Sequence, residues 1–304
     1  MKKLIPPLIV VAVIAGSLHG ENSNPPLSKL HRDIEISEVI LEEVVLGTHT
    51  VEGFLGKVEG FYFPEKGLIF VVNVPLLLGT PAETLEVRVK DFFCHYLIAF
   101  PYLDRNERIR VALRYEYPSF EGLLKEEGEG PQVVVFSIKK ADLDKYKSGK
   151  LSEKALRAKI KVTEIRDLPR DVRVMGAILK ETIDSPESMA LYLPDDGAYF
   201  LYYGRGIRHV LESLKSLRGR IELKVRKEVE HRIKAKEREL IETLALYSGT
   251  LVSLKEHDYV NIGISMTREG PTFILQAKKG DLVKLSKKEL TTEEFSKRIR
   301  HLRY

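Results

Sequence analysis

The sequence predicts an α+β fold built from two tandem copies of one α-ββ-α-ββ-α unit, with mainly antiparallel sheets. Three observations support this prediction. Three blocks of sequence recur in the same order, strand-like apolar stretches occur in pairs, and amphipathic stretches with helical spacing separate these pairs. We expect the first unit to span residues 30–162 and the second to span residues 163–304.

The first recurring block is a hairpin motif of the form Tyr-x-Pro-x-x-Gly-x-x-Phe. It begins at Tyr62 in the first copy and at Tyr192 in the second. Glycine can adopt a positive φ and proline restricts the approach to the turn, so the motif predicts a tight connection between two strands. In the first copy we expect one strand to end at Phe63 and the next to start at Leu68.

The other two blocks extend the match along each copy. Residues 96–113 match residues 247–264 without a gap, and residues 139–160 match residues 278–299 in the same way. A Glu-Gly-Pro sequence precedes the latter block in both copies. One extra residue follows that sequence in the first copy, and we expect it to form a β-bulge.

Each unit is expected to open with an amphipathic helix. Apolar residues at positions 36, 39, 40, 44 and 45 predict a helix over Ile36–Leu46, and Val172–Ile183 is its counterpart. A second helix should contain Tyr96 in the first unit and Tyr247 in the second.

Two strands and a closing helix complete each predicted unit. Ser152 is the expected cap of a helix over 153–160, and Thr291 with Glu294 forms a capping box for the last helix. The expected strand pairs are 108–117 with 132–138 and 259–266 with 272–277.

Two further stretches alternate apolar and charged residues, as strands do. They are Leu85–Lys90 and Ile221–Arg226, and we expect each to add a fifth strand to its unit. A longer helix should follow in the second unit, because its apolar residues keep a helical period from Val229 to Leu244.

The predicted order of elements resembles that of the Roadblock and profilin-like folds, which are small sheet-and-helix modules that act as interaction platforms. The hairpin motif that begins at Tyr62 is also similar to one in a family of exported, uncharacterised bacterial proteins. The first resemblance implies a role as an interaction platform, and neither implies a catalytic residue.

The N-terminus has the three parts of a secretory signal peptide. Lys2 and Lys3 precede a short apolar run, and the small residues Ala15 and Ser17 form a cleavage site before Leu18. We therefore expect residues 1–17 to be a signal peptide, residues 18–29 to be a linker, and the mature chain to be periplasmic or extracellular. An uncleaved membrane anchor is the alternative. No later stretch is apolar enough to cross a membrane.

Composition limits the classes of partner. The net charge of +5 falls by two on removal of Lys2 and Lys3, which is too small an excess to indicate a nucleic-acid partner. Charged residues make up 31% of the chain and tryptophan is absent, a balance typical of thermophilic proteins. The segment 205–238 is locally basic, and a solvated helix with mixed charges is favoured there over contact with a membrane surface.

No catalytic residue, cofactor site or metal site is predicted. Asp91 and His95 share a helical spacing but lack a third ligand, and the single cysteine, Cys94, lies in an apolar run that favours a core position. The strongest candidate for contact with an anion or another ligand is a glycine-rich turn. Its candidate residues are Arg205, Arg208 and His209.

These features predict an exported, non-enzymatic module that binds another envelope protein, a ligand or a second copy of itself. The alternative is a hydrolase or transferase whose site lies between the two units. That site would be built from scattered residues such as His95, His209 and Asp196.

Overall fold

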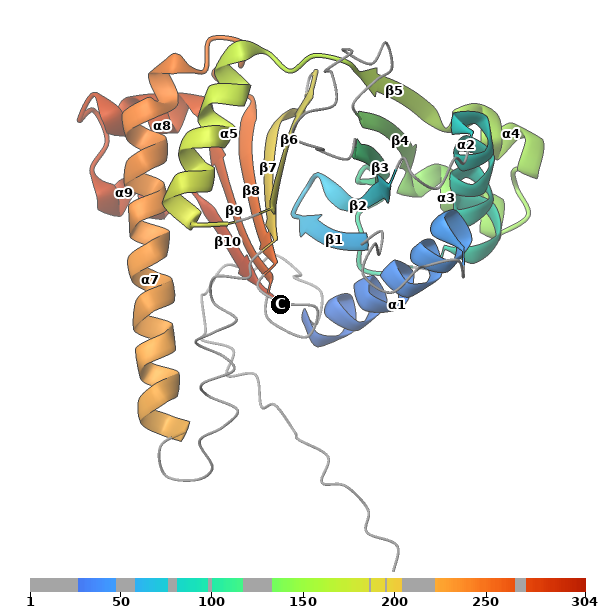
Figure 1. The fold of residues 1–304 in the computed structure, drawn as a ribbon, viewed down its shortest axis with the longest axis horizontal. Coiled ribbons are helices and arrows are strands. Elements are labelled where there is room, and N and C mark those ends of the chain that lie inside the picture. Colours follow the sequence, from blue (N-terminus) through green and yellow to red (C-terminus); the bar gives the residue numbers. More distant parts are fainter. Residues whose placement is uncertain are drawn as a thin grey trace, which may run out of the picture.

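The computed structural model describes residues 27–47, 58–75, 81–97, 100–116, 133–185, 187–194, 196–203, 222–265 and 272–304. These residues form four layers, in which two five-stranded sheets face each other and helices cover the outer side of each sheet (Figure 1). The predicted α+β class with two units is confirmed. No helix in the described part of the chain is long and apolar enough to cross a membrane.

The first unit contains the sheet β1-β2-β3-β4-β5. Its elements are α1 (Leu27–Leu46), β1 (Val58–Phe63), β2 (Gly67–Pro75), α2 (Ala82–Asp91), the π-helical turn η2 (Phe92–Tyr96), β3 (Arg108–Glu116), β4 (Val133–Lys139), α3 (Lys140–Lys147), α4 (Glu153–Lys159) and β5 (Lys161–Ile165).

The second unit contains the sheet β6-β7-β8-β9-β10. Its elements are α5 (Arg170–Ile183), β6 (Glu187–Leu193), β7 (Gly197–Tyr203), α7 (Glu222–Tyr247), the 3₁₀ turn η3 (Ser248–Thr250), β8 (Tyr259–Ser265), β9 (Thr272–Lys278), α8 (Lys279–Ser286), α9 (Thr292–Ser296) and β10 (Arg300–Arg303).

The two sheets have the same strand order and the same directions. In each, the second and third strands are parallel and the other pairs are antiparallel. The parallel pairs are also in equivalent register, since Gly67 pairs with Arg108 and Gly197 pairs with Tyr259. A helix connects the strands of each parallel pair, as such a crossover requires.

The hairpin glycines are placed as the motif predicts. Gly67 has a φ of +94° and Gly197 a φ of +110°. A Cβ atom would lie 2.0 Å from the carbonyl oxygen of Arg108 at the first position, and 2.1 Å from that of Tyr259 at the second. Only glycine fits a backbone with this φ and this close approach.

The predicted caps of the closing helices are confirmed. The hydroxyl of Ser152 accepts the N–H of Ala155 at 3.3 Å, and α4 begins directly afterwards. Thr291 and Glu294 form the expected capping box at the start of α9. These caps require only a few neighbouring residues, which explains why sequence alone located them.

The predicted fifth strands are in the wrong place. Leu85–Lys90 lies within α2, and all but the first residue of 221–226 lies within α7. In α2 the buried residues Leu85 and Val89 are four positions apart, while Val87 is 54% exposed, so the buried face follows the period of a helix. The fifth strands are β5 and β10, each of which follows the closing helix of its unit.

The predicted β-bulge is also wrong within the described strands. β3 and β4 pair in continuous register from Arg108 with Lys139 to Arg114 with Val133. The pairing of β8 with β9 is equally regular. The extra residue of the first copy therefore precedes Val133, outside the described residues.

The first helix is longer than predicted, and its buried face is different. α1 includes residues 27–29, which the sequence analysis assigned to the linker. Its core face contains Leu30, Ile34, Leu41 and Val45, whereas residues 36 and 39 are exposed. The strand β5 spans the predicted boundary at 162, so the connection between the units comprises residues 166–169.

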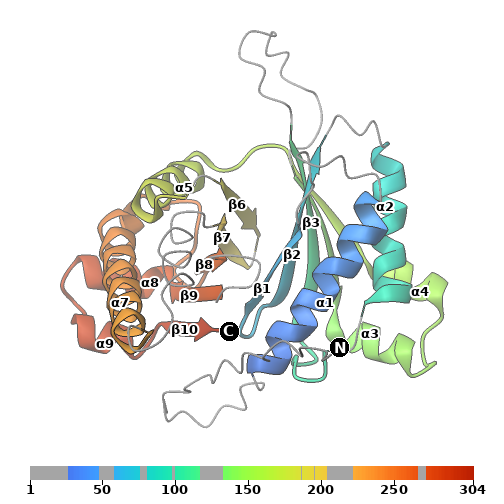
Figure 2. The ribbon, with the colours of Figure 1, turned by 60° about the horizontal axis from the view of Figure 1, so that its bottom comes forward.

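The facing sides of the two sheets contribute to one buried hydrophobic cluster, and a second cluster lies within the second unit. Met189, Leu191 and Leu193 of β6 belong to the same buried cluster as the strands of the first unit. The packing is close, because a Cβ atom on Gly263 would lie 2.6 Å from the Phe61 ring. Figure 2 shows the two sheets facing each other between the helix layers. The repeat units therefore form one packed body.

Candidate functional site

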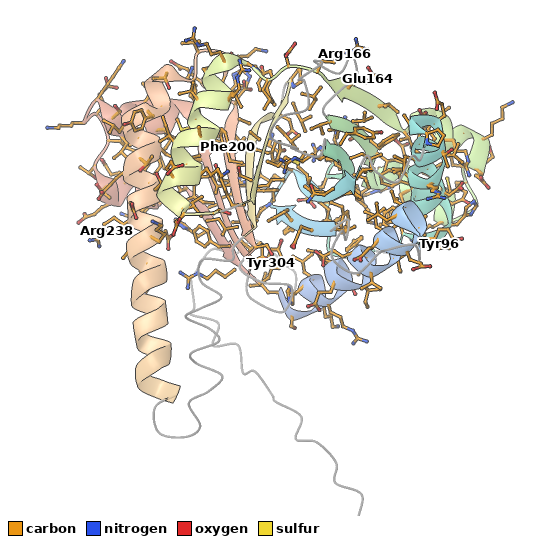
Figure 3. All side chains as sticks on the ribbon, viewed as in Figure 1. Tyr96, Glu164, Arg166, Phe200, Arg238 and Tyr304 are labelled. Carbon is orange, nitrogen blue, oxygen red and sulfur yellow. The ribbon has the colours of Figure 1, made fainter. Side chains whose placement is uncertain are left out.

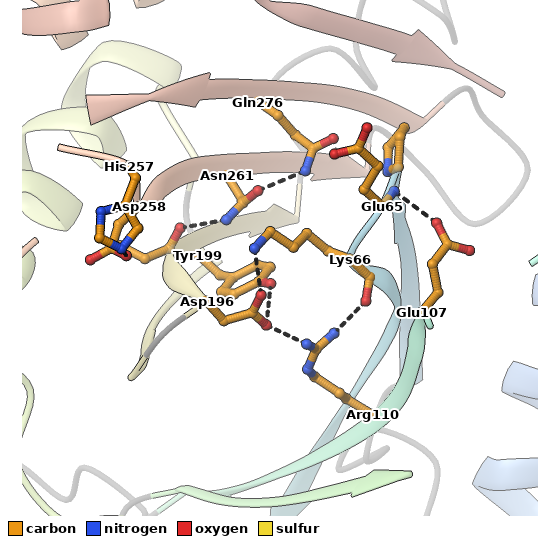
Figure 4. Close-up of polar contacts among 12 residues, drawn as sticks. Glu65, Lys66, Glu107, Arg110, Asp196, Tyr199, His257, Asp258, Asn261 and Gln276 are labelled. Carbon is orange, nitrogen blue, oxygen red and sulfur yellow. Dashed lines mark hydrogen bonds and ion pairs between the residues drawn. The ribbon is translucent and has the colours of Figure 1, made fainter. Parts of the chain in front are cut away.

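The two hairpins meet between the sheets, at Lys66 and Asp196. These residues hold equivalent positions in the hairpin motif, and the Lys66 Nζ lies 2.7 Å from the Asp196 Oδ1 (Figure 4). Contact between equivalent positions is expected where an approximate two-fold axis relates two copies. This place is therefore the centre of the interface between the units, where an enzymatic site between the units would lie.

Asp196 is fully engaged at this interface. Besides Lys66, it forms an ion pair with the buried Arg110 and accepts a hydrogen bond from the Tyr199 hydroxyl at 2.9 Å. Burial alone would raise the pKa of Asp196, but Arg110 and Lys66 outweigh burial and hold this pKa below its ordinary value. The carboxylate is thus anionic and its oxygens are occupied, which suits a structural clamp better than proton transfer.

Uncharged polar groups continue this interface across the second sheet. The Asn261 side chain donates to the carbonyl of Ala198 at 3.1 Å and accepts from Gln276 at 2.9 Å. Both amides are buried. Since buried polar groups cost free energy unless they are hydrogen-bonded, these bonds hold the strands in register.

The other residues considered in the sequence do not converge on this place. His95 lies 3.5 Å from Glu153, on the helix-covered side of the first unit that its neighbour Tyr96 marks in Figure 3. Asp91 instead pairs with Arg157. Within the described ranges, no group of three or more His, Cys, Asp or Glu residues could hold a metal ion.

Two further expectations concern Cys94 and the glycine-rich turn. Cys94 is buried, and burial raises the pKa of its thiol, as expected of a core cysteine. Arg205, Arg208 and His209 lie outside the described residues, as does the basic segment 205–238 up to residue 221.

The outer edge of the first sheet is closed by side chains. The N–H of Gly60 donates to the Glu38 carboxylate at 2.6 Å, and the N–H of Tyr62 donates to the Tyr304 hydroxyl at 2.7 Å. Both groups lie on the edge of β1 that faces away from β2. α1 and the end of the chain therefore satisfy the backbone groups that an edge strand would otherwise expose.

The equivalent edge of the second sheet has fewer partners among the described residues. Arg114 donates to the carbonyl of Ser188 at 3.1 Å, on the side of β6 that faces away from β7. Because alternate residues of a strand point their N–H and C=O groups to the same edge, those of Ala190 and Tyr192 also point outward. Among the residues that the structure describes, none bonds to these two N–H groups.

A groove of about 240 Å³ lies beside this edge, between β6 and α5. Arg173, Gly176, Ala177 and Lys180 line it from one face of α5, because residues spaced by three, four and seven positions share a helical face. Ser188, Met189 and Ala190 line it from β6. We call this feature the β6 edge groove.

The small residues of α5 leave this groove open. A Cβ atom on Gly176 would lie 3.4 Å from that of Ala190, so helix and strand approach closely at this point. Ser188, Ala190 and Tyr192 are half-buried, whereas their counterparts in β1 are buried. The helix α5 is also shorter than its counterpart α1, with 14 residues against 20.

No protein-family model, curated protein or solved structure matches this chain. The geometry of the described residues therefore carries the functional argument. The β6 edge groove was not predicted, because the recurring blocks do not include the opening helices. The stretch Ser188–Leu193 contains no charged residue, and this is the feature of the sequence that could have indicated a strand edge suited to binding.

Proposed function

We propose that this chain is an exported, non-enzymatic interaction module that binds an extended segment of another protein along the edge of β6. The observation that carries the proposal is the difference between the two equivalent edges. Side chains close the edge of β1, whereas the N–H groups of Ala190 and Tyr192 have no partner among the described residues. An added strand would supply carbonyl acceptors for these groups.

β6 is held in place by its pairing with β7 and by its packing in the core, so its outer edge is already formed before a partner binds. The strand pairs with β7 along its length, and Met189 and Leu191 are anchored in the core between the sheets. A rigid edge loses little conformational entropy when a segment binds, so more of the interaction energy contributes to affinity.

Other edges in the molecule carry features that discourage strand addition. β5 has Lys161 and Glu164 exposed along its length, and β10 has four residues, of which two are arginine. Charged side chains and short length are common protections of sheet edges. β6 has seven residues and only its first, Glu187, is charged, so most of its length lacks these protections.

The alternative, a hydrolase or transferase with a site between the units, receives less support. The carboxylate of Asp196 is occupied by three partners, and burial raises the pKa of Tyr199. His95 lies in the helix layer of the first unit. The N-terminal signal pattern at residues 1–17 supports the exported part of the proposal.

The substitution Ala190→Pro tests the proposed binding mode, because proline lacks the N–H that an added strand would use. The fold should persist, since proline is tolerated in an edge strand when the missing N–H faces away from the sheet. The probe is a fluorescent nine-residue peptide in which valine alternates with glutamine, and Ala190→Ser is the matched control.

We expect the probe to bind the native chain and Ala190→Ser, with Ala190→Pro weaker by at least about tenfold, in line with the loss of one or two hydrogen bonds in a desolvated site. Amide hydrogen exchange should slow at Ala190 and Tyr192 when the probe binds. Equal binding to all three chains, or no binding to the native chain, would contradict the proposal.

A further inference from the structure

We infer that the segment bound at the β6 edge groove is acidic, with carboxylates on the side chains that face α5. This inference rests on the proposed function and names the chemistry of the partner. The groove has two cationic side chains, Arg173 and Lys180, and no acidic residue in its lining. A partner with carboxylates at these positions would complement the charge of the groove.

Both cations are available for a partner. No carboxylate pairs with Arg173 or Lys180 within the described part of the chain. By contrast, Lys66, Arg157 and Arg300 each form an ion pair within the molecule. Glu181 near the end of α5 and Asp184 at its C-cap do not line the groove. Among the residues that the structure describes, no acidic group therefore neutralises the two groove cations.

The distance between the two cations falls between one and two repeats of same-face residues in an added strand, so long side chains such as glutamate are needed to reach both. Seven residues of helix separate Arg173 from Lys180, which is about 10 Å along the axis of α5. Alternate residues of a strand share one face and are about 7 Å apart, so every second side chain of a bound segment faces α5. Glutamate at these alternate positions would place carboxylates near both cations, while Gly176 and Ala177 leave space for the backbone between them.

A second copy of the chain fits this groove less well. Pairing of β6 with β6 from another molecule would bring a second Arg173 and a second Lys180 to the same place. Like charges close together oppose such pairing. The charge of the groove thus favours an acidic segment of a different protein over self-association.

The test compares three fluorescent nine-residue peptides in which valine alternates with glutamate, glutamine or lysine. Each is titrated against the native chain, the charge reversal Arg173→Glu with Lys180→Glu, and a control reversal. The control is Lys150→Glu with Lys154→Glu, two exposed lysines of the first unit that change the net charge equally. Circular dichroism and thermal unfolding confirm that each variant folds.

We expect the glutamate peptide to bind the native chain and the control about tenfold more tightly than the glutamine peptide at low salt, as two partly desolvated ion pairs allow. The variant that carries Arg173→Glu and Lys180→Glu should instead bind the lysine peptide more tightly than the glutamate peptide. High salt should reduce the difference, because exposed charges are screened. If glutamate and glutamine peptides bind the native chain equally while Ala190→Pro still prevents binding, the acidic inference fails and the proposed function stands.

Backbone methylation separates strand addition from simple charge attraction. Two versions of the glutamate peptide carry N-methyl groups, one on the glutamates and the other on the valines. Only one set of N–H groups can face β6 in an added strand, so exactly one version should lose binding. If the two versions bind equally well, the contact depends on charge alone and the proposed geometry is wrong.

Discussion

The carboxylate of Glu38 accepts the N–H of Gly60 at 2.6 Å and closes the edge of β1. In the second unit the equivalent strand residue, Ala190, has no such partner among the described residues. Within the described residues, side chains thus satisfy the edge N–H groups of one unit and leave the equivalent N–H groups of the other without a partner. This difference between equivalent strands identified the candidate binding site.

Removal of the Glu38 carboxylate should destabilise the first unit. In Glu38→Ala the buried N–H of Gly60 loses its acceptor, and an unsatisfied buried donor costs about 1–3 kcal/mol. We expect a loss of this size in urea unfolding. Glu43→Ala, at an exposed position of the same helix, should change the stability by less than about 0.5 kcal/mol. Equal effects of the two substitutions would show that the bond to Gly60 contributes nothing.

The ion pairs of Asp196 should contribute strongly to stability at neutral pH. Asp196→Asn leaves Lys66 and the buried Arg110 without their counter-charge, and the loss of one partner from a buried pair costs about 3 kcal/mol or more. Urea unfolding at pH 7 measures this loss. Glu164→Gln, in an exposed ion pair with Arg166, is the control and should cost about 0–1 kcal/mol.

The contribution of Asp196 should also depend on pH. The pKa of its carboxyl in the folded chain lies below the ordinary value of 3.8, so its ionised form stabilises the fold above that value. The stability is lost as the pH falls through the folded pKa. The difference in unfolding free energy between the native chain and Asp196→Asn should therefore shrink below about pH 4. A difference that stays constant from pH 7 to pH 2.5 would contradict this assignment.

The two hairpin glycines should be equally intolerant of substitution. In Gly67→Ala and Gly197→Ala the new Cβ meets a carbonyl oxygen, at 2.0 Å and 2.1 Å respectively, in a backbone of positive φ. We expect each to lose more than about 2 kcal/mol of unfolding free energy, through strain and displacement of the parallel strand pair.

Gly149→Ala separates these two causes. Gly149 also has a positive φ, of +73°, but a Cβ atom there would meet nothing within 4 Å. Its substitution should cost only the conformational strain, about 1 kcal/mol. If Gly67→Ala and Gly149→Ala cost the same, the close approach to Arg108 does not limit the hairpin.

Export should remove the first 17 residues. Production of the whole chain in a secreting host should yield a protein that begins at Leu18, because small residues at Ala15 and Ser17 fit the cleavage site. Amino-terminal sequencing measures the cleavage position. Ala15→Asp should prevent cleavage, and a native chain that still begins at Met1 would contradict the prediction.

Features that depend on near neighbours were predicted correctly from the sequence. The hairpin turns follow from proline and glycine within six residues, and the cap at Thr291 depends on Glu294 three residues away. In Leu85–Lys90, by contrast, alternation of apolar and charged residues misled the prediction. Leu85 and Val89 are both buried and four positions apart, as on one face of a helix.

The sequence by itself determined the duplication, the hairpins and the capped helices, because each arises from local conformational preference or from comparison of the chain with itself. Only the tertiary structure decided which sheet edge its side chains close. Tyr304 closes the edge at Tyr62 from 242 residues away, and Glu38 reaches Gly60 from another element. A strand edge is satisfied or left open by groups that folding brings beside it, so local sequence does not reveal the β6 edge groove.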